Sequence, residues 1–275
     1  MTPWHYRWLC QFAYIDLPKE VRPGLTLQKI SSLLQKAHSS GSLPCGPLPP
    51  DSLEALSILR STPELASLTL VESINRNAST GLVFYVLRDQ SGCFHILFRG
   101  SETRGCGVPT GVDWLDNFLA PFAGSLQYPE ITALARRFPD ARVVFCGHSK
   151  GAHNALCALA SLPNERARAV VFNGQGFSPS QLTRPQKTRL ARQAVNYVTR
   201  TDPVGALLYH PEKRVFTQAH PSVHPHALSA FVFGKKGRPL PAFRSLRSYA
   251  IEFSSRIAVR PRGLPAAGAA VCSAE

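Results

Sequence analysis

The strongest constraint on the fold is an alternation of short apolar runs with helical patterns, which starts near residue 80. Six runs rich in β-branched and aromatic residues lie over 82–87, 94–98, 142–147, 168–174, 194–199 and 214–218. Helical patterns lie between some of these runs, over 112–120, 129–137 and 149–162. Continuous apolar runs of this length are typical of strands buried on both faces. Their alternation with helices predicts an α/β protein with a mostly parallel sheet and helices on both faces.

Two helical patterns precede this sheet region. The first spans 25–37, and the second opens with Asp51 and Glu54 at capping spacing and runs toward Leu59. A connector rich in Ser, Gly and Pro, residues 38–50, separates them.

Length and composition fit one folded domain. The chain has 275 residues, 44% of them hydrophobic, which is more apolar material than a disordered chain contains. No apolar run approaches the roughly 18 residues that span a bilayer. We expect a single domain over residues 1–256, with a helical N-terminal segment at 1–62 and a sheet core at about 80–235. Residues 257–275 are rich in Pro, Ala, Gly and Arg and are expected to form a flexible tail.

One junction between a strand and a helix carries a reactive serine pattern. The sequence GHSKG at 147–151 follows an apolar run and precedes a helical pattern. A sharp turn there lifts the Ser149 hydroxyl clear of the sheet, and the flanking glycines tolerate the crowded backbone. The same turn directs the Lys150 N–H and the helix dipole at a developing oxyanion. Ser149 is therefore the candidate nucleophile, and a glycine-rich turn with an idle serine is the alternative.

A serine nucleophile needs a base and an acid that orients the base, and in this fold type they follow in the order Ser, Asp or Glu, His. Asp202 comes directly after the run at 194–199. The carboxyl ends of parallel strands share one edge, so Asp202 is expected beside Ser149 as the triad acid. Its competing role is a helix N-cap before Pro203.

Three histidines follow Asp202 in one loop: His220, His224 and His226. We favour His226 as the general base because it opens the apolar run ALSAF, which provides a packed segment to fix its rotamer; His224 is the runner-up. Three histidines within seven residues are also compatible with a metal-binding site. Two prolines interrupt the cluster and no cysteine lies between Cys157 and Cys272, so we disfavour a metal.

A second oxyanion donor is expected from the loop after an earlier strand. The run at 94–98 ends at Arg99 and Gly100, and Ser101 follows. The backbone N–H and the hydroxyl of Ser101, together with the Lys150 N–H, are therefore the predicted oxyanion hole.

Positive charge gathers in the C-terminal half. The chain carries a formal net charge of +14, and the segment 184–262 holds 15 Lys and Arg against three acids. Basic surfaces attract phosphates of lipid headgroups or nucleic acid. No zinc-finger spacing, aromatic RNA-binding signature or basic heptad region organises the charge, so nucleic acid is disfavoured. An ordinary solvated face is the alternative.

The seven cysteines are scattered without a CxxC pair, which indicates reduced thiols. The first twenty residues lack the pattern of a signal peptide. We expect synthesis in the cytoplasm, and export by a signal-independent route stays open.

Taken together, these motifs resemble the class 3 (fungal-type) lipases and a bacterial family similar to them. The matching segments, in the expected order, are FAYID (12–16), FRGS (98–101), DWLD (113–116), GHSKG (147–151), NGQGF (173–177) and TDPVG (201–205). The resemblance implies an α/β-hydrolase fold and hydrolysis of an ester, typically of an acylglycerol or phospholipid. By position it implies Ser149 as nucleophile, Asp202 as triad acid and the histidine near 226 as base.

The chain departs from the family pattern after the serine, where Lys150, Gly151 and Ala152 replace the usual Leu-Gly-Gly. Ala152 stands in place of a glycine that lets the elbow helix pack closely. Lys150 places a cation beside the nucleophile, which favours anionic substrates. No long apolar lid is visible, although 105–111 is rich in glycine.

The sequence predicts a serine ester hydrolase of the lipase or phospholipase type, acting on lipid esters through an acyl-enzyme without a metal or organic cofactor. Thioester hydrolysis or acyl transfer would use the same triad. The alternative is a catalytically inactive hydrolase fold that binds acidic membranes or a partner through its basic C-terminal half.

Overall fold

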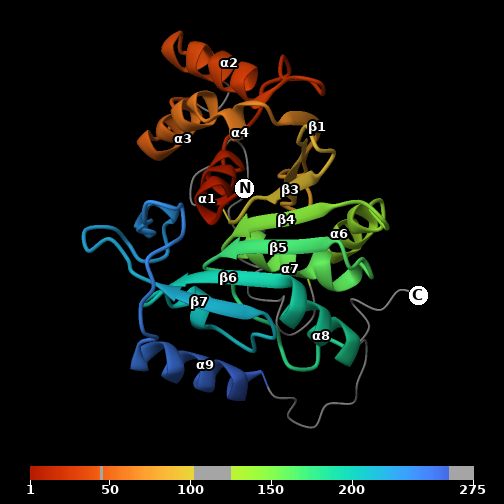
Figure 1. Ribbon diagram of the computed structural model, residues 1–275, viewed down its shortest axis with the longest axis vertical. Helices are drawn as coiled ribbons and strands as arrows, with labels where there is room; N and C mark the ends of the chain where they lie inside the picture. Colours follow the sequence, from red (N-terminus) through yellow and green to blue (C-terminus); the bar gives the residue numbers. More distant parts are fainter. Residues whose placement is uncertain (44–45, 102–124, 260–275) are drawn as a thin grey trace.

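A computed structural model describes residues 1–43, 46–101 and 125–259, and within them seven strands form one sheet (Figure 1). The strands are β1 (Thr69–Asn75), β2 (Val83–Arg88), β3 (Phe94–Phe98), β4 (Val143–His148), β5 (Ala167–Phe172), β6 (Ala194–Thr199) and β7 (Lys213–Thr217). They lie side by side in chain order. β1, β2 and β3 pair antiparallel, and β3 to β7 pair parallel. The mostly parallel sheet predicted from the sequence is confirmed.

Helices cover both faces of this sheet. The helices of the described residues are α1 (Pro3–Phe12), α2 (Leu27–Ser39), α3 (Pro50–Ser61), α4 (Pro63–Ala66), α6 (Tyr128–Ala135), α7 (Lys150–Ser161), α8 (Arg184–Gln193) and α9 (Leu246–Ala258), with 3-10 turns η1 (Val204–Ala206) and η2 (Leu228–Ala230). Parallel strands that are added in one direction place their right-handed crossover helices on the same face. Accordingly α7 contacts both α6 and α8, while α1 contacts β3, β4 and β5. The α/β-hydrolase fold is therefore formed with α1 covering the face that the crossover helices leave open.

Two apolar cores result, one on each face of the sheet. Side chains of a strand alternate between the faces, so Phe84 and Val86 of β2 join the core beneath α6, α7 and α8. Tyr85 and Leu87 join the core that contains α1, α2 and α3. This division explains why the strand sequences are continuously apolar.

Arg99, at the end of β3, ties the N-terminal segment to the sheet. Its buried guanidinium donates to the Ala13 carbonyl (2.5 Å), the Asp16 carboxylate (2.8 Å) and the Tyr85 hydroxyl (3.0 Å). The Tyr85 hydroxyl in turn donates to the Ile15 carbonyl at 2.6 Å. The segment FAYID therefore lies against the end of β3, directly before Ser101.

The predicted strands all occur, within one or two residues of their expected bounds. The sheet begins earlier than expected, because β1 precedes residue 80, and α8 and α9 were not predicted. α9 includes residues 257 and 258, which composition assigns to the tail; the Ser245 side chain caps this helix by accepting from the Ser248 N–H. The predicted helix at 112–120, the glycine-rich 105–111 and the DWLD motif lie outside the described residues. No helix in the described ranges has the length and apolar character needed to cross a bilayer.

Figure 1 also shows how the peripheral helices are arranged. α2 and α3 lie beyond α1, toward the β1 end of the molecule, and α9 lies at the opposite end beside β7. The central strands, which carry the reactive serine pattern, lie between these two groups.

Candidate active site

Ser149 occupies the turn between β4 and α7 in a strained backbone conformation. Its φ and ψ are 59° and −124°, a combination that L residues rarely adopt. A side chain at Gly147 would collide with the Gly151 carbonyl, and one at Gly151 would collide with the backbone of Phe98 and Arg99. Both glycines are therefore required for the helix to start this close to the sheet, as the GHSKG pattern predicts.

The structure brings Ser149, His226 and Asp202 together. His226 Nε2 lies 2.9 Å from Ser149 Oγ, and His226 Nδ1 lies 2.8 Å from Asp202 Oδ1. Asp202 is buried, so its carboxylate holds the imidazole with the proton on Nδ1 and leaves Nε2 free to accept the serine proton. This arrangement fits general-base activation of a serine hydroxyl.

The other two histidines of the loop lie elsewhere. His224 is exposed, and its Nδ1 accepts a hydrogen bond from the His226 N–H at 3.3 Å. His220 is exposed and accepts from the Ser222 N–H at 3.4 Å. The geometry therefore selects His226 over the runner-up His224 as the imidazole that faces both Ser149 and Asp202.

Three polar side chains hold the His226 loop in place, and sequence reasoning did not assign them this role. His148 Nε2 donates to the His226 carbonyl at 2.7 Å, and Asn173 Nδ2 donates to the carbonyls of Pro225 and His226, both at 3.1 Å. Thr199 Oγ1 donates to the Pro225 carbonyl at 2.5 Å. These donors come from the ends of β4, β5 and β6, so the sheet edge itself sets the loop position. The NGQGF motif was the signal available for Asn173.

His148 is kept neutral beside the triad. The Tyr14 hydroxyl donates to its Nδ1 at 2.8 Å, and its ring centroid lies 4.8 Å from that of His226. Burial, followed by the charge of a protonated His226, lowers the pKa of His148 to about 3. Because His148 stays uncharged, it does not oppose the imidazolium that His226 forms when it takes a proton.

The predicted oxyanion residues border the same turn. Ser101 follows β3, which pairs parallel with β4, and is half-buried at that sheet edge. A side chain on the preceding Gly100 would collide with the Tyr14 hydroxyl and the His148 carbonyl and would come within 3.3 Å of the Ser149 Cβ, so this backbone lies directly against the turn that carries the nucleophile. Lys150 is a buried residue. Because it is the first residue of α7, its backbone N–H belongs to the N-terminal turn of that helix, where N–H groups have no partner within the helix.

The alanine that replaces a family glycine is accommodated by a second glycine. Ala152 is fully buried in the first turn of α7, and a side chain on Gly174 would collide with its Cβ. Gly174 follows β5 and leaves space for the extra methyl group. α7 therefore packs onto the sheet despite the substitution.

A possible metal-ligand group lies away from the triad. Asp89, Cys93 and His95 bring their ligand atoms within 4.8 Å of one another in the hairpin between β2 and β3. Asp89 Oδ2 lies 3.3 Å from His95 Nε2, while Asp89 Oδ1 accepts the backbone N–H groups of Ser91 and Cys93. These hydrogen bonds are those of a turn-forming aspartate. Among the described residues, the loop histidines 220, 224 and 226 form no such group.

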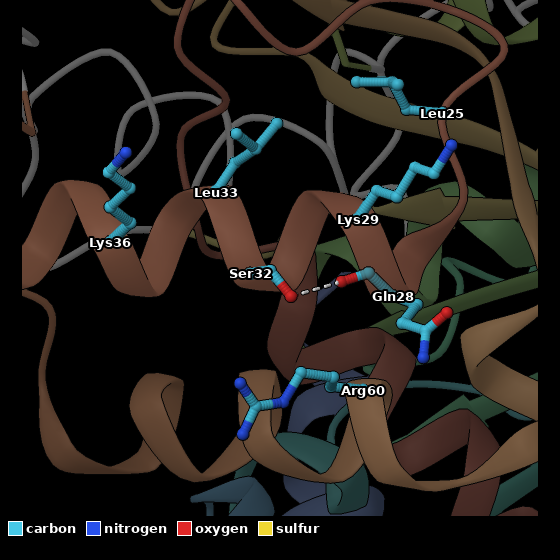
Figure 2. A pocket seen from close by; sticks show the side chains of 7 residues that line it. All are labelled: Leu25, Gln28, Lys29, Ser32, Leu33, Lys36 and Arg60. Carbon is cyan, nitrogen blue, oxygen red and sulfur yellow. Dashed lines mark hydrogen bonds between the residues drawn. The ribbon is translucent and has the colours of Figure 1, made fainter.

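A basic groove between α2 and α3 is also separate from the triad. It has a volume of about 490 Å³, and Figure 2 shows Lys29, Lys36 and Arg60 among its lining residues. Leu25 and Leu33 supply its apolar surface. Because α2 and α3 contribute no side chain to the triad, the groove belongs to the helical N-terminal segment rather than to the site.

Comparison with known proteins gives one family match. A model described as Mbeg1-like matches residues 64–236, a stretch that includes Ser149, Asp202 and His226. This family is lipase-like, as the motifs indicate. A comparison with curated proteins finds no match.

Several solved structures are similar in overall chain course. A fungal lipase is 15% identical and has a TM-score of 0.48, over 88% of this chain and 90% of that chain. A mutant form of MDLA from Penicillium cyclopium is 12% identical with a TM-score of 0.49, over 87% and 84% of the two chains. Lip2 lipase from Yarrowia lipolytica is 12% identical with a TM-score of 0.43, over 82% and 80%.

Proposed function

The chain belongs to the Mbeg1-like family, which is lipase-like, and from this premise we propose that it is a serine hydrolase that cleaves carboxylic esters of lipids. One observation carries the proposal. Ser149 Oγ, the His226 ring and the Asp202 carboxylate form a continuous hydrogen-bonded chain, with steps of 2.9 and 2.8 Å.

The proposed reaction proceeds through an acyl-enzyme. Ser149 Oγ attacks the ester carbonyl carbon while His226 Nε2 takes the hydroxyl proton. The backbone N–H groups of Lys150 and Ser101 stabilise the tetrahedral oxyanion. His226 then returns its proton to the leaving alcohol. In the second half of the reaction, water attacks the acyl-enzyme carbonyl while His226 takes its proton, and that proton passes to Ser149 Oγ as the fatty acid leaves. Asp202 keeps the imidazole oriented and stabilises its charged form.

We place the substrates among acylglycerols and phospholipids, because lipase-like relatives act on lipid esters. The charge of Lys150 beside the nucleophile favours anionic esters within this class. Thioester hydrolysis and acyl transfer would use the same triad. A panel of triacylglycerol, neutral and anionic phospholipids and an acyl thioester ranks these substrates.

Active-site labelling tests the nucleophile. We expect a fluorophosphonate probe to label the wild type and Ser61→Ala, which removes an exposed serine of α3, but not Ser149→Ala. Turnover of a short-chain ester should fall about 10³-fold or more in Ser149→Ala. Equal labelling or equal turnover of the two variants would disprove the proposal.

Histidine substitutions test the base. Replacing His226 with alanine should lower turnover about 10³-fold or more, because no other imidazole faces both Ser149 and Asp202 among the described residues. His224→Ala and His220→Ala should each stay within about twofold of the wild type, since both side chains are exposed. A larger loss in His224→Ala than in His226→Ala would assign the base to His224 instead.

A second candidate function uses the fold without the chemistry. The basic segment 184–262 supports binding to acidic membranes or to a partner. Vesicle binding that persists in Ser149→Ala, combined with no ester turnover in the wild type, would favour this function over hydrolysis.

A further inference from the structure

α9 (Leu246–Ala258) exposes a stripe of large apolar side chains. In a helix that repeats every 3.6 residues, positions 246, 250, 253 and 257 lie on one face, and position 249 lies at its edge. The exposed fractions are 87% for Leu246, 55% for Tyr249, 69% for Phe253 and 50% for Ile257, and Phe243, just before the helix, is 93% exposed. Soluble proteins rarely group so many exposed large apolar residues without a partner. We call Phe243, Leu246, Tyr249, Phe253 and Ile257 the α9 stripe.

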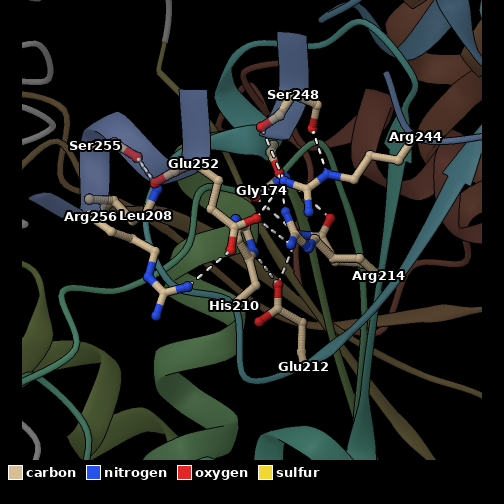
Figure 3. Close-up of polar contacts among 12 residues, drawn as sticks. Gly174, Leu208, His210, Glu212, Arg214, Arg244, Ser248, Glu252, Ser255 and Arg256 are labelled. Atoms are coloured by element: carbon tan, nitrogen blue, oxygen red, sulfur yellow. Dashed lines mark hydrogen bonds and ion pairs between the residues drawn. The ribbon is translucent and has the colours of Figure 1, made fainter. Parts of the chain in front are cut away.

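Polar contacts on the opposite face fix the orientation of this helix. The Glu252 carboxylate pairs with Arg214 of β7 at 2.6 Å and with Arg244 at 2.5 Å (Figure 3). Ser255 Oγ accepts the Leu208 N–H at 2.8 Å. Rolling the helix to bury its apolar face would break these bonds and expose the arginines of the pair. The stripe therefore faces outward as a consequence of how α9 is attached.

Positive charge borders the stripe on both sides. At 100° per residue, Arg247 and Arg256 lie on opposite flanks of the apolar face, and both are exposed. Glu252 is the only acid in α9, and its carboxylate is engaged by Arg214 and Arg244 and lies 3.5 Å from Arg256. The helix therefore presents apolar and cationic groups to the outside and no free carboxylate.

From this pattern we propose that the α9 stripe docks onto an anionic phospholipid bilayer. An amphipathic helix with aromatic and aliphatic residues on one face and arginines at its borders is suited to the interface between headgroups and acyl chains. A second copy of this chain fits less well, because the arginines of both copies would face each other without an acid to pair with. Docking of this kind does not depend on ester hydrolysis.

The position of α9 links such docking to the triad. α9 contacts η1, the 3-10 turn that follows Asp202. Arg214, which pairs with Glu252 of α9, also donates to the Gly205 carbonyl of that turn at 3.4 Å. A docked α9 is therefore joined directly to the segment that carries the triad carboxylate.

Vesicle flotation tests the proposal. The wild-type chain should bind vesicles of phosphatidylcholine mixed with phosphatidylserine more tightly than vesicles of phosphatidylcholine alone. The double variant Leu246→Ser/Phe253→Ser should weaken binding about tenfold or more, because it removes two apolar anchors. Leu33→Ser, which removes an exposed leucine from α2, is the matched control and should bind as the wild type does.

Substitutions that remove a single positive charge separate the electrostatic contribution to vesicle binding from the apolar one. Arg247→Gln should weaken binding to the anionic vesicles about fivefold and leave binding to neutral vesicles unchanged. Arg192→Gln, at an exposed position of α8, changes the net charge equally and should have little effect. Circular dichroism establishes that each variant is folded.

Three outcomes would overturn the proposal: no binding of the wild type to anionic vesicles, unaltered binding of the Leu246→Ser/Phe253→Ser variant, or a wild-type dimer in solution that this variant abolishes. Capture of an acidic protein in place of lipid would overturn it as well. Ser149→Ala should bind vesicles as the wild type does, so a loss of hydrolysis and a loss of docking are distinguishable.

Discussion

Asp202 carries two roles, one on each carboxylate oxygen. Oδ1 lies 2.8 Å from His226 Nδ1, and Oδ2 accepts the Gly205 N–H at 2.5 Å. The sequence left a choice between a triad acid and a capping residue before Pro203. A carboxylate has enough lone pairs for both contacts, so the hydrogen bond from the Gly205 N–H anchors the same side chain that contacts the imidazole.

His148 is a buried residue whose pKa differs strongly from its value in water. It donates from Nε2 to the His226 carbonyl and accepts from Tyr14 at Nδ1, and the second contact requires the neutral ring. Burial is the main reason that its pKa lies near 3, far below the ordinary 6.5. The residue therefore positions the His226 loop without titrating near neutral pH.

This pKa predicts how stability changes with pH. Between pH 6.5 and about 3 the unfolded chain binds a proton at His148 that the folded protein does not. Acidification through that window should therefore lower the free energy of unfolding by up to about 1.4 kcal/mol per pH unit from this group, with no contribution above it. Urea unfolding at stepped pH values should give a shallower dependence in His148→Gln than in the wild type. Parallel pH curves for the two proteins would contradict the assignment.

At the scale of elements, the site depends on how closely α7 starts against the sheet. The close approach of Gly147 and Gly151 sets the start of the helix, and the pair Ala152 and Gly174 sets how it packs beside β5. The sequence pattern of the turn shows only that Ala152 stands in place of a glycine that lets the helix pack closely. The compensating glycine lies 22 residues later, which only the packing of β5 against α7 reveals.

A double-mutant cycle tests this pairing. Gly174→Ala should lower the free energy of unfolding by about 1–3 kcal/mol, because the added methyl group meets the Ala152 Cβ. Adding Ala152→Gly should restore part of that loss, although Ala152→Gly alone costs about 1 kcal/mol in helix propensity. Chemical denaturation of the four proteins measures the coupling. Strictly additive effects would show that the two residues do not share the space.

The sequence pattern did not predict α9, and the reason is physical. Helical periodicity locates an amphipathic helix by assuming that its apolar face packs on the core. In α9 the apolar residues Leu246, Tyr249, Phe253 and Ile257 face outward, and the inward face carries Ser248, Glu252 and Ser255 beside the half-buried Ile251. The segment therefore lacks a contribution to either core, and its attachment depends on arginines from β7 and from the preceding loop.

At the scale of the whole molecule, the net charge of +14 acts together with the α9 stripe. Salt shortens the Debye length from about 30 Å at 0.01 M to about 8 Å at 0.15 M. Binding to anionic vesicles should therefore weaken as salt rises, and Phe253→Ser should show a steeper relative loss because less apolar anchoring remains. Flotation across a salt series measures both. Binding of the wild type that is independent of salt would show that the basic charge does not contribute.

The sequence by itself determined the alternation of strands and helices, the serine turn and the order in which Ser149, Asp202 and a group of loop histidines follow one another. These features depend on neighbouring residues and on the rule that parallel strands end at one edge. Only the tertiary structure decided which loop histidine meets Ser149, since the loop is positioned by His148, Asn173 and Thr199 from three different strands. It also decided that α9 faces its apolar side outward. Contacts between residues far apart in the chain set both outcomes, and local sequence patterns carry no record of such contacts.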